Sequence, residues 1–254
     1  MASVKRRNTS PLGAQAALVV VASFLPASGA AQTLDEIVAR HLQARGGAAR
    51  IEAVQSLRMT GKARASGGRE ALVVREIKRP GRVRTEFTVQ GLTGVYASDG
   101  ERGWQVSPFD SEMEPRPMPA EAARLALEQA DIGGPLLDWK TKGHAVELVG
   151  RTTEGGHETW KLTVTPKGGS ARHLYLDAQT YLLVRLESPR QLAGRTVEAE
   201  TTFADYRETG GLRFAHSIEI GVKGRPHRVK VVVEKVEIDP ALDDARFRMP
   251  EPSR

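Results

Sequence analysis

Most of the sequence alternates apolar and polar residues in short runs that are separated by glycine-rich breaks. Because successive side chains of a β-strand point to opposite faces of a sheet, this period of two predicts strands with one apolar face. Asp99-Gly100, between two such runs, is typical of a hairpin turn, since both residues tolerate a positive φ. The pattern predicts about twelve antiparallel strands in one large curved sheet, at Ser56–Ala65, Glu70–Lys78, Arg82–Val89, Thr93–Ser98, Arg102–Val106, Ala145–Arg151, His157–Thr165, Ala171–Asp177, Leu182–Ser188, Thr196–Arg207, Leu212–Val222 and His227–Ile238.

Three short helices are predicted beside these strands. The first begins with a capping box formed by Thr33 and Glu36 and ends before Gly46. A second helix is expected over 48–55, and a third over Ala120–Ala130, which follows a proline-rich stretch. Many strands with a few short helices predict an α+β domain.

The first 31 residues have the composition of a secretory signal peptide. Lys5, Arg6 and Arg7 precede an apolar stretch from Ala14 to Leu25, and small residues follow up to position 31. The stretch is shorter than the roughly 20 residues that cross a bilayer, so cleavage is expected. We therefore predict a signal peptide over 1–31 and one domain over 32–254, which is exported from the cytoplasm. Cleavage removes three of 37 basic and none of 31 acidic residues, which halves the net charge of +6.

Few residues have the spacing that catalysis or metal binding requires. The chain has no cysteine, which excludes disulfides, thiol nucleophiles and Cys-based metal sites. Its six histidines show no H-x-H or H-E-x-x-H spacing, and G-x-S-x-G does not occur. His216 is expected as a hydrogen-bonded core residue, and Glu198 and Glu200 on a solvated strand face. We expect no catalytic residue, no metal and no cofactor.

The two basic runs, at 78–84 and 225–230, carry little aromatic character. Alternation places Arg82, Arg84 and Glu86 on one side of a strand, opposite Val83 and its neighbours. Nucleic-acid surfaces usually combine basic residues with exposed aromatics. The runs are therefore expected to be solvated strand faces, and no nucleic-acid partner is predicted.

Several motifs occur in the order and at the spacing of one known family. Ile77-Lys78-Arg79-Pro80, Ser98-Asp99-Gly100, Trp104 and Pro108-Phe109 resemble the K-R-P, S-D-G, W and P-F pattern of LolA. The opening at 33–61 and the closing stretch at 238–250 resemble the same outer-membrane lipoprotein-sorting family, the LolA/LolB-like superfamily. The resemblance covers nearly all of 32–251. It implies that the curved sheet is an open half-barrel of about eleven strands with short helices over its mouth.

This resemblance implies a periplasmic carrier of lipoprotein acyl chains or of another envelope lipid. Such a monomeric carrier accepts its cargo from an inner-membrane transporter and shields it on the way to an outer-membrane acceptor. At about 0.8 kcal/mol per CH₂, one 16-carbon chain costs on the order of 10 kcal/mol to hold in water. The carrier must therefore offer comparable apolar burial, and it needs no covalent chemistry or cofactor.

Alternation within the predicted strands selects candidates for the lipid-binding lining. These are the apolar residues expected on the concave side, namely Leu57, Met59, Val83, Phe87, Val95, Trp104, Trp160, Leu162, Val164, Leu174, Leu176, Phe203, Phe214, Ile218 and Ile220. The alternative for each is ordinary core packing under the helices. An aromatic content of 5% predicts a mainly aliphatic cavity.

Arg79 is the candidate gating residue. The resemblance matches it to the arginine that in LolA bonds the lid helices and keeps the empty cavity closed. We expect its guanidinium to bond carbonyls of the helix at Ala120–Ala130 or of the loop at Gly133–Leu137.

Two other functions stay open at this point. One is a lipid- or lipoprotein-sensing regulatory module that passes a signal to a membrane partner. The other is a β-rich hydrolase whose carboxylates come from different strands. The lack of cysteine favours a freely diffusing carrier over a lipid-anchored receptor of the same fold.

Overall fold

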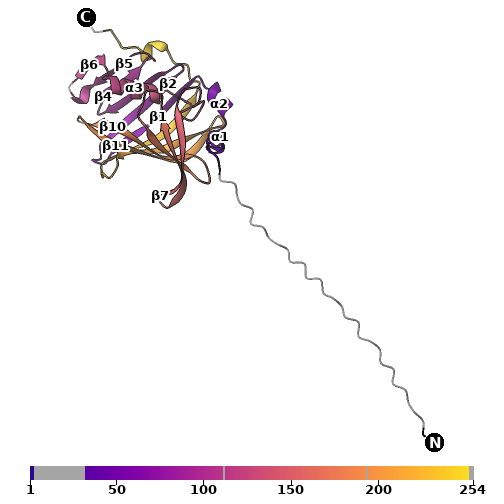
Figure 1. The fold of residues 1–254 in the computed structure, drawn as a ribbon. Helices are drawn as coiled ribbons and strands as arrows, with labels where there is room; N and C mark the ends of the chain where they lie inside the picture. Colours follow the sequence, from indigo (N-terminus) through magenta and orange to yellow (C-terminus); the bar gives the residue numbers. More distant parts are fainter. Residues whose placement is uncertain (3–31, 111, 193, 252–254) are drawn as a thin grey trace. The chain divides into compact units, whose positions relative to one another are not determined.

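The structure of the protein, a computed structural model, describes residues 1–2, 32–110, 112–192 and 194–251 (Figure 1). The expected signal peptide lies outside these residues, apart from its first two. Gln32–Arg254 form one unit of the chain. No helix in the described ranges is long and apolar enough to cross a membrane.

The described residues form three α-helices, two 3-10 helices and thirteen strands. In chain order they are α1 (Leu34–Ala44), α2 (Ala48–Ala53), β1 (Ser56–Ala65), β2 (Glu70–Lys78), β3 (Arg82–Val89), β4 (Leu92–Ser98), β5 (Gly103–Ser107), η1 (Pro108–Asp110), β6 (Glu112–Pro117), α3 (Ala120–Gln129), β7 (Ala145–Glu154), β8 (His157–Thr165), β9 (Arg172–Asp177), β10 (Leu183–Leu192), β11 (Arg195–Thr209), β12 (Leu212–Val222), β13 (Arg228–Ile238) and η2 (Asp244–Phe247).

All thirteen strands belong to one antiparallel sheet, in the order β6-β5-β4-β3-β2-β1-β13-β12-β11-β10-β9-β8-β7. Strands β1 to β6 form one consecutive meander, and β7 to β13 form another. The two meanders join where β1 pairs with β13. The edge strands β6 and β7 do not pair with each other, so the sheet is open.

The α+β class and the open half-barrel predicted from the sequence are confirmed. The capping box of α1 is present, with Thr33 Oγ1 accepting from the Glu36 backbone N–H and the Glu36 carboxylate accepting from the Thr33 N–H. The strand count was too low by one, because β6 contains Pro115 and Pro117 and was interpreted as a proline-rich connection. Proline is tolerated on an edge strand, where one side of the backbone needs no partner.

The helices pack on one face of the sheet, which we call the inner face. Leu57, Ile77 and Val83 are cross-strand neighbours in β1, β2 and β3, and they form one buried cluster with residues of α2 and of the turn after α3. A second cluster lies between α1 and strands β7 to β10. The core is therefore the space between the inner face and its helices.

The opposite, outer face is covered in part by the C-terminal segment. Phe247 is fully buried there, and its carbonyl oxygen accepts a hydrogen bond from Trp104 Nε1 at 2.8 Å. Arg246 Nε donates to the buried carboxylate of Glu76 at 2.7 Å. Lys78 Nζ donates to the Leu242 carbonyl oxygen at 2.7 Å, so the segment is bound to β2 and β5 at several points.

A bulge interrupts the pairing of β1 and β13 between Thr60 and Gly61. Bulges bend a strand and increase its twist, which helps a large sheet to curve. A Cβ on Gly61 would lie 2.0 Å from the Val232 carbonyl oxygen, so the two backbones approach more closely than a side chain permits.

We expect Gly61→Ala to lower the free energy of unfolding by about 1–3 kcal/mol, because the added methyl group must displace the β13 backbone. Urea denaturation measures this change. Gly67→Ala is the matched control, since a Cβ there meets nothing within 4 Å. Equal effects of the two substitutions would contradict the close approach at Gly61.

Candidate functional site

The inner face carries a row of apolar cross-strand neighbours in the centre of the sheet. Phe203 in β11 is opposite Ile218 in β12, and Ile218 is opposite Val231 in β13. Ile220 and Val229 are the next opposed pair on the same face. Ile220 is 43% exposed and Val229 39%, and the other three side chains are half-buried. We call these five residues the apolar strip.

Ten of the predicted lining residues lie in or against the two inner-face clusters. Leu57, Val83 and Phe214 are buried with α2 and the turn after α3, and Met59 and Ile218 pack against them. The other five, buried beneath α1, are Trp160, Leu162, Val164, Leu174 and Leu176. In this conformation all ten pack as core, which was the alternative considered from the sequence.

Three more predicted residues lie on the inner face outside these clusters. Phe203 and Ile220 belong to the apolar strip. Phe87 in β3 is opposite Val73 in β2, and its ring meets the ring of Tyr96 edge-on at a centroid distance of 6.1 Å. Thirteen predicted lining residues therefore share the inner face.

Val95 and Trp104 were placed on the wrong face. Val83 is opposite Ser98, so the residues of β4 that share its face are Ser98 and Tyr96. Val95 has the opposite parity, and Trp104 is opposite Ala97, so both side chains lie on the outer face under the C-terminal segment. Alternation gives the parity within a strand, but it does not give the register that relates two strands.

Residues 120–137, which we call the cover segment, comprise α3 and the turn that follows it. Ala130, Ile132 and Leu137 of this segment are buried in the same cluster as Leu57 and Val83. At the other end of the segment, a Cβ on Gly103 of β5 would lie 2.9 Å from Ala123 Cβ. The cover segment thus lies directly on the part of the inner face formed by β1 to β5.

Three arginines from separate elements bind the cover segment. Arg45, just after α1, donates from Nη1 to the Gly133 carbonyl oxygen at 2.5 Å and from Nη2 to that of Ile132 at 3.1 Å. Arg75 Nη2 donates to the last carbonyl of α3, on Gln129, at 2.8 Å, where the helix dipole favours a cation. Burial lowers the pKa of Arg75 to about 10. Arg172 Nη2 pairs with the Glu128 carboxylate at 2.6 Å.

The expected contacts of Arg79 were wrong. Its Nε donates to the Val54 carbonyl oxygen at 2.8 Å and its Nη2 to that of Ile51 at 3.3 Å, so it closes the C-terminal end of α2 instead of binding the cover segment. Sequence reasoning missed Arg45, Arg75 and Arg172, because no local spacing connects residues that meet only through the sheet register.

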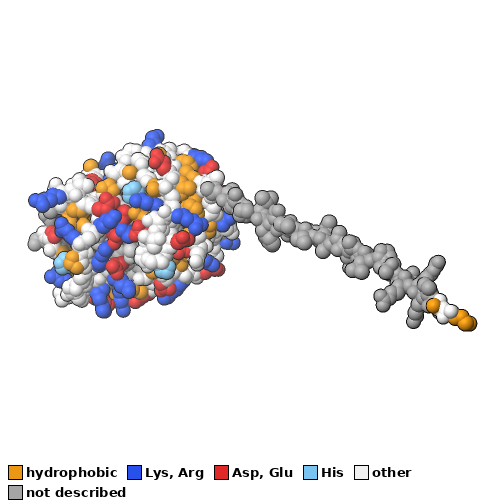
Figure 2. All heavy atoms as spheres, turned by 60° about the horizontal axis from the view of Figure 1, so that its bottom comes forward, with side chains coloured by type: hydrophobic (Ala, Val, Ile, Leu, Met, Phe, Trp, Pro, Cys, Tyr) orange, Lys and Arg blue, Asp and Glu red, His pale blue; other side chains and the backbone are white. Residues whose placement is uncertain are grey.

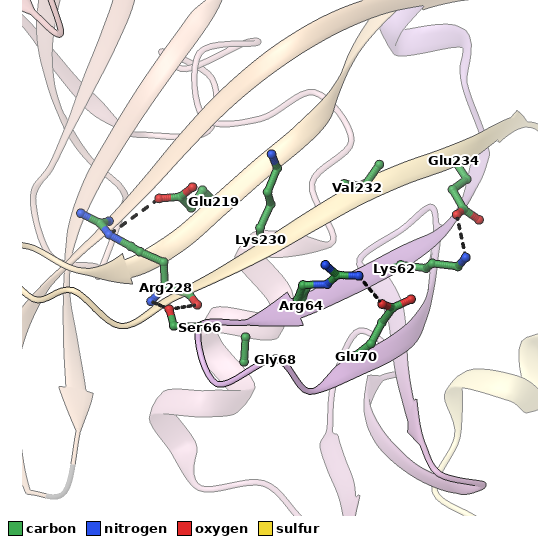
Figure 3. Close-up of a pocket in the computed structure, with 11 residues that line it drawn as sticks. Lys62, Arg64, Ser66, Gly68, Glu70, Glu219, Arg228, Lys230, Val232 and Glu234 are labelled. Carbon is green, nitrogen blue, oxygen red and sulfur yellow. Dashed lines mark hydrogen bonds and ion pairs between the residues drawn. The ribbon is translucent and has the colours of Figure 1, made fainter.

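The outer face contains a hollow of about 630 Å³ over β1, β2, β12 and β13 (Figure 3). Its three carboxylates pair with basic side chains of the same hollow. Arg64 meets Glu70 at 2.8 Å, Lys62 meets Glu234 at 3.5 Å, and Arg228 meets Glu219 at 3.9 Å, as the dashed lines in Figure 3 mark. Figure 2 likewise shows acidic and basic side chains interspersed over the face it presents. Every carboxylate of the hollow is thus in an ion pair.

A buried ion network lies on the outer face between β9 and β12. Glu187 is only 2% exposed, and its carboxylate accepts from Tyr175 Oη at 2.8 Å, from Lys223 Nζ at 2.7 Å and from Arg185. Burial alone would raise the pKa of Glu187, but the hydrogen bonds from Lys223, Tyr175 and Arg185 lower it to about 2. The network holds a permanent carboxylate and not an acid poised near neutral pH.

Glu200 belongs to the same network, which corrects the expectation of a solvated strand face. It is 8% exposed and pairs with Arg185 at 2.7 Å and with Arg228 at 2.5 Å. Glu198, two residues earlier, is exposed as expected. His216 is buried, with Nδ1 2.7 Å from the Val233 carbonyl oxygen, which confirms its expected place in the core. No group of three His, Cys, Asp or Glu side chains within the described ranges is placed to hold a metal ion.

Because the folded-state pKa of Glu187 lies below its ordinary value, this group stabilises the fold above about pH 4.5 and loses that effect as the pH falls towards 2. We expect Glu187→Gln to cost about 2 kcal/mol near neutral pH and less at pH 3, since wild type has by then lost part of the same contribution. Urea denaturation at both pH values measures this gap, which is the difference in the free energy of unfolding between wild type and the variant. Glu198→Gln is the exposed control, and a gap for Glu187→Gln that does not change with pH would contradict the network's role.

Comparisons with known proteins support the fold through structure and not through sequence. No protein-family profile matches the chain, and no curated protein sequence matches it. An outer membrane lipoprotein-sorting protein domain from Vibrio parahaemolyticus matches 84% of this chain and 94% of its own, with a TM-score of 0.53 at 14% identity. The LolA superfamily protein NE2245 from Nitrosomonas europaea matches 86% and 98%, with a TM-score of 0.54 at 12% identity.

A DUF1329 family protein from Desulfovibrio piger has a TM-score of 0.57 at 12% identity, and the match covers 84% of this chain and 96% of that one. Each match spans nearly the whole of the other protein, so the likeness concerns a complete domain and not a shared hairpin. The chain therefore shares its fold with these lipoprotein-sorting and LolA-superfamily structures, as its motifs predicted.

Proposed function

We propose that this protein is a periplasmic carrier that binds the acyl chains of lipoproteins, or of another envelope lipid, on the inner face of its sheet. It takes up and releases them by reversible burial, without covalent chemistry or a cofactor. It works as a monomer after cleavage of the signal peptide and passes its cargo from an inner-membrane donor to an outer-membrane acceptor. The fold it shares with lipoprotein-sorting domains supports this function.

The apolar strip is the observation that carries the proposal. Its five side chains are neighbours on three adjacent strands, and two of them are more than a third exposed. The outer side of the same strands carries Glu219 and Lys230, directly opposed and charged. An apolar surface on one side only of an open sheet fits a ligand that must be removed from water.

The nine clustered lining residues other than Ile218 extend this surface beneath the cover segment and α1. Their burial beneath the cover segment and α1 requires that an acyl chain displace part of this cover before it reaches them. The hydrogen bonds of Arg45 and Arg75 to the cover oppose that displacement. The binding free energy is therefore the difference between two terms. One is the gain from burying the acyl chain, about 0.8 kcal/mol per CH₂, and the other is the free-energy cost of displacing the cover segment.

We expect Ile220→Lys to weaken the binding of a fluorescent 16-carbon fatty acid at least tenfold, because an ammonium group on the apolar strip must lose water when the chain binds. Titration of the probe followed by fluorescence measures the change. The exposed position should keep the fold stable, which thermal denaturation checks.

Val232→Lys is the matched control. Val232 lies on a strand next to Ile220 and has nearly the same exposure, 42% against 43%, but it points to the outer face. It should leave probe binding within about twofold of wild type. Equal losses for the two variants, or none for Ile220→Lys, would overturn the proposed binding face.

We expect Arg45→Gln to tighten probe binding about fivefold, since losing hydrogen bonds worth about 1 kcal/mol raises the population with a displaced cover. Slower release of the probe in stopped-flow chase experiments is the second readout. Arg79→Gln tests the gate predicted from the sequence, because it frees α2 instead. Tightening by Arg79→Gln alone would assign the gate to α2 and contradict the role of Arg45.

A further inference from the structure

A second hollow, of about 500 Å³, lies between α1, α2 and two turns of the sheet, and it shares no residue with the apolar strip. It is lined by Arg40, Gln43, Ala44, Gly46, Arg50, Thr180, Tyr181, Glu208, Gly211 and Arg213. Three arginines from three different elements therefore surround one space, with a single carboxylate.

Two of these guanidinium groups are held in place by neutral partners. Arg40 Nη1 donates to Tyr181 Oη at 3.0 Å, and its guanidinium lies 5.2 Å from the centre of the Tyr181 ring. Arg50 Nη1 donates to the carbonyl oxygens of Gly46 at 2.9 Å and Gly211 at 3.2 Å. Each guanidinium group is thus oriented by neutral groups, and no carboxylate offsets its positive charge.

The backbone turns around the hollow are tightly packed, and glycines stand where they approach other groups most closely. Gly211 has a φ of +76°, and a Cβ there would lie 2.9 Å from Arg50 Cζ. A Cβ on Gly46 would lie 2.2 Å from the Gly211 carbonyl oxygen. Tyr181 has a left-handed φ of +58°, which is costly for a residue with a side chain and is often found at binding sites. The end of α1 and the β11–β12 turn thus pack tightly behind the arginines.

The third arginine, Arg213, has no partner for its side chain among the described residues. Glu208 is its cross-strand neighbour, but no ion pair joins the two side chains among the described residues. Exposed arginines elsewhere do find carboxylates, as Arg64 does with Glu70, and Arg151 with Glu158. The hollow therefore keeps a local excess of two positive charges.

We propose that this hollow binds a phosphate group, either free or as the phosphomonoester headgroup of a lipid. Planar guanidinium groups match the tetrahedral oxygens of phosphate with paired N–H donors, and they keep their charge at every physiological pH. Arg213 supplies the unpaired donors, and Arg40 and Arg50 supply fixed ones. The site does not depend on the proposed acyl binding, because its residues and those of the apolar strip are separate.

Isothermal titration of the protein with inorganic phosphate, in a phosphate-free buffer of low ionic strength, tests this site. We expect a Kd of about 1 mM or tighter, and a loss of at least tenfold in affinity for Arg213→Gln and for Arg50→Gln. Arg225→Gln is the control, since Arg225 is an exposed arginine in the β12–β13 turn that pairs with no carboxylate in the described part of the chain. Circular dichroism confirms that each variant is folded.

Sedimentation with vesicles distinguishes the two sources of the phosphate. A lipid headgroup site predicts that phosphatidylcholine vesicles containing phosphatidic acid bind the protein, that inorganic phosphate competes, and that Arg213→Gln abolishes the binding. A site for free phosphate predicts calorimetric binding without sedimentation. Absence of both signals at about 10 mM phosphate, or equal losses for Arg213→Gln and Arg225→Gln, would overturn the proposal.

Discussion

The pairing of the first strand with the last is the contact on which the rest of the structure depends. Strands β1 and β13 lie at opposite ends of the domain sequence, and their ladder joins two meanders that would otherwise be separate sheets. Asp239 fixes this junction, because its Oδ1 accepts from the backbone N–H groups of Gln55 at 2.7 Å and Ser56 at 2.9 Å. Loop closure over so long a chain costs entropy, so these contacts form only with the whole sheet.

Once the junction is formed, the two faces of the sheet are stabilised by different interactions. The inner face buries apolar side chains against short helices, whereas the only layer that the described residues place on the outer face is the C-terminal segment. Instead of a full second layer, the outer face carries ion networks centred on buried carboxylates such as Glu76 and Glu187. Buried carboxylates are favourable only when several donors satisfy them, and each of these two has at least two. The outer face thus gains stability from these ion networks as well as from the small apolar cluster around Trp104 and Phe247.

Much of this architecture could be predicted from the sequence. The predictions that failed did so for one common reason. Period-two alternation located twelve of the thirteen strands, and the capping box located the start of α1. The same alternation failed for Val95 and Trp104, since parity within β4 and β5 says nothing about their register with β3. The predicted contacts of Arg79 were wrong for a related reason. Its motif predicts that the side chain bonds a helix, but it does not say which helix. Contacts between distant elements depend on register, which no local spacing encodes.

Because the two faces are stabilised by different interactions, part of the inner face can stay exposed to solvent. Exposed apolar neighbours such as Ile220 and Val229 lower the solubility of a protein and add little to its stability. A sheet that relied on its inner face alone would have to bury them. Here the outer networks, the C-terminal segment and the cluster under α1 stabilise the strands on either side. The apolar strip can therefore stay exposed without unfolding the sheet that presents it, and the proposed carrier function requires such a surface.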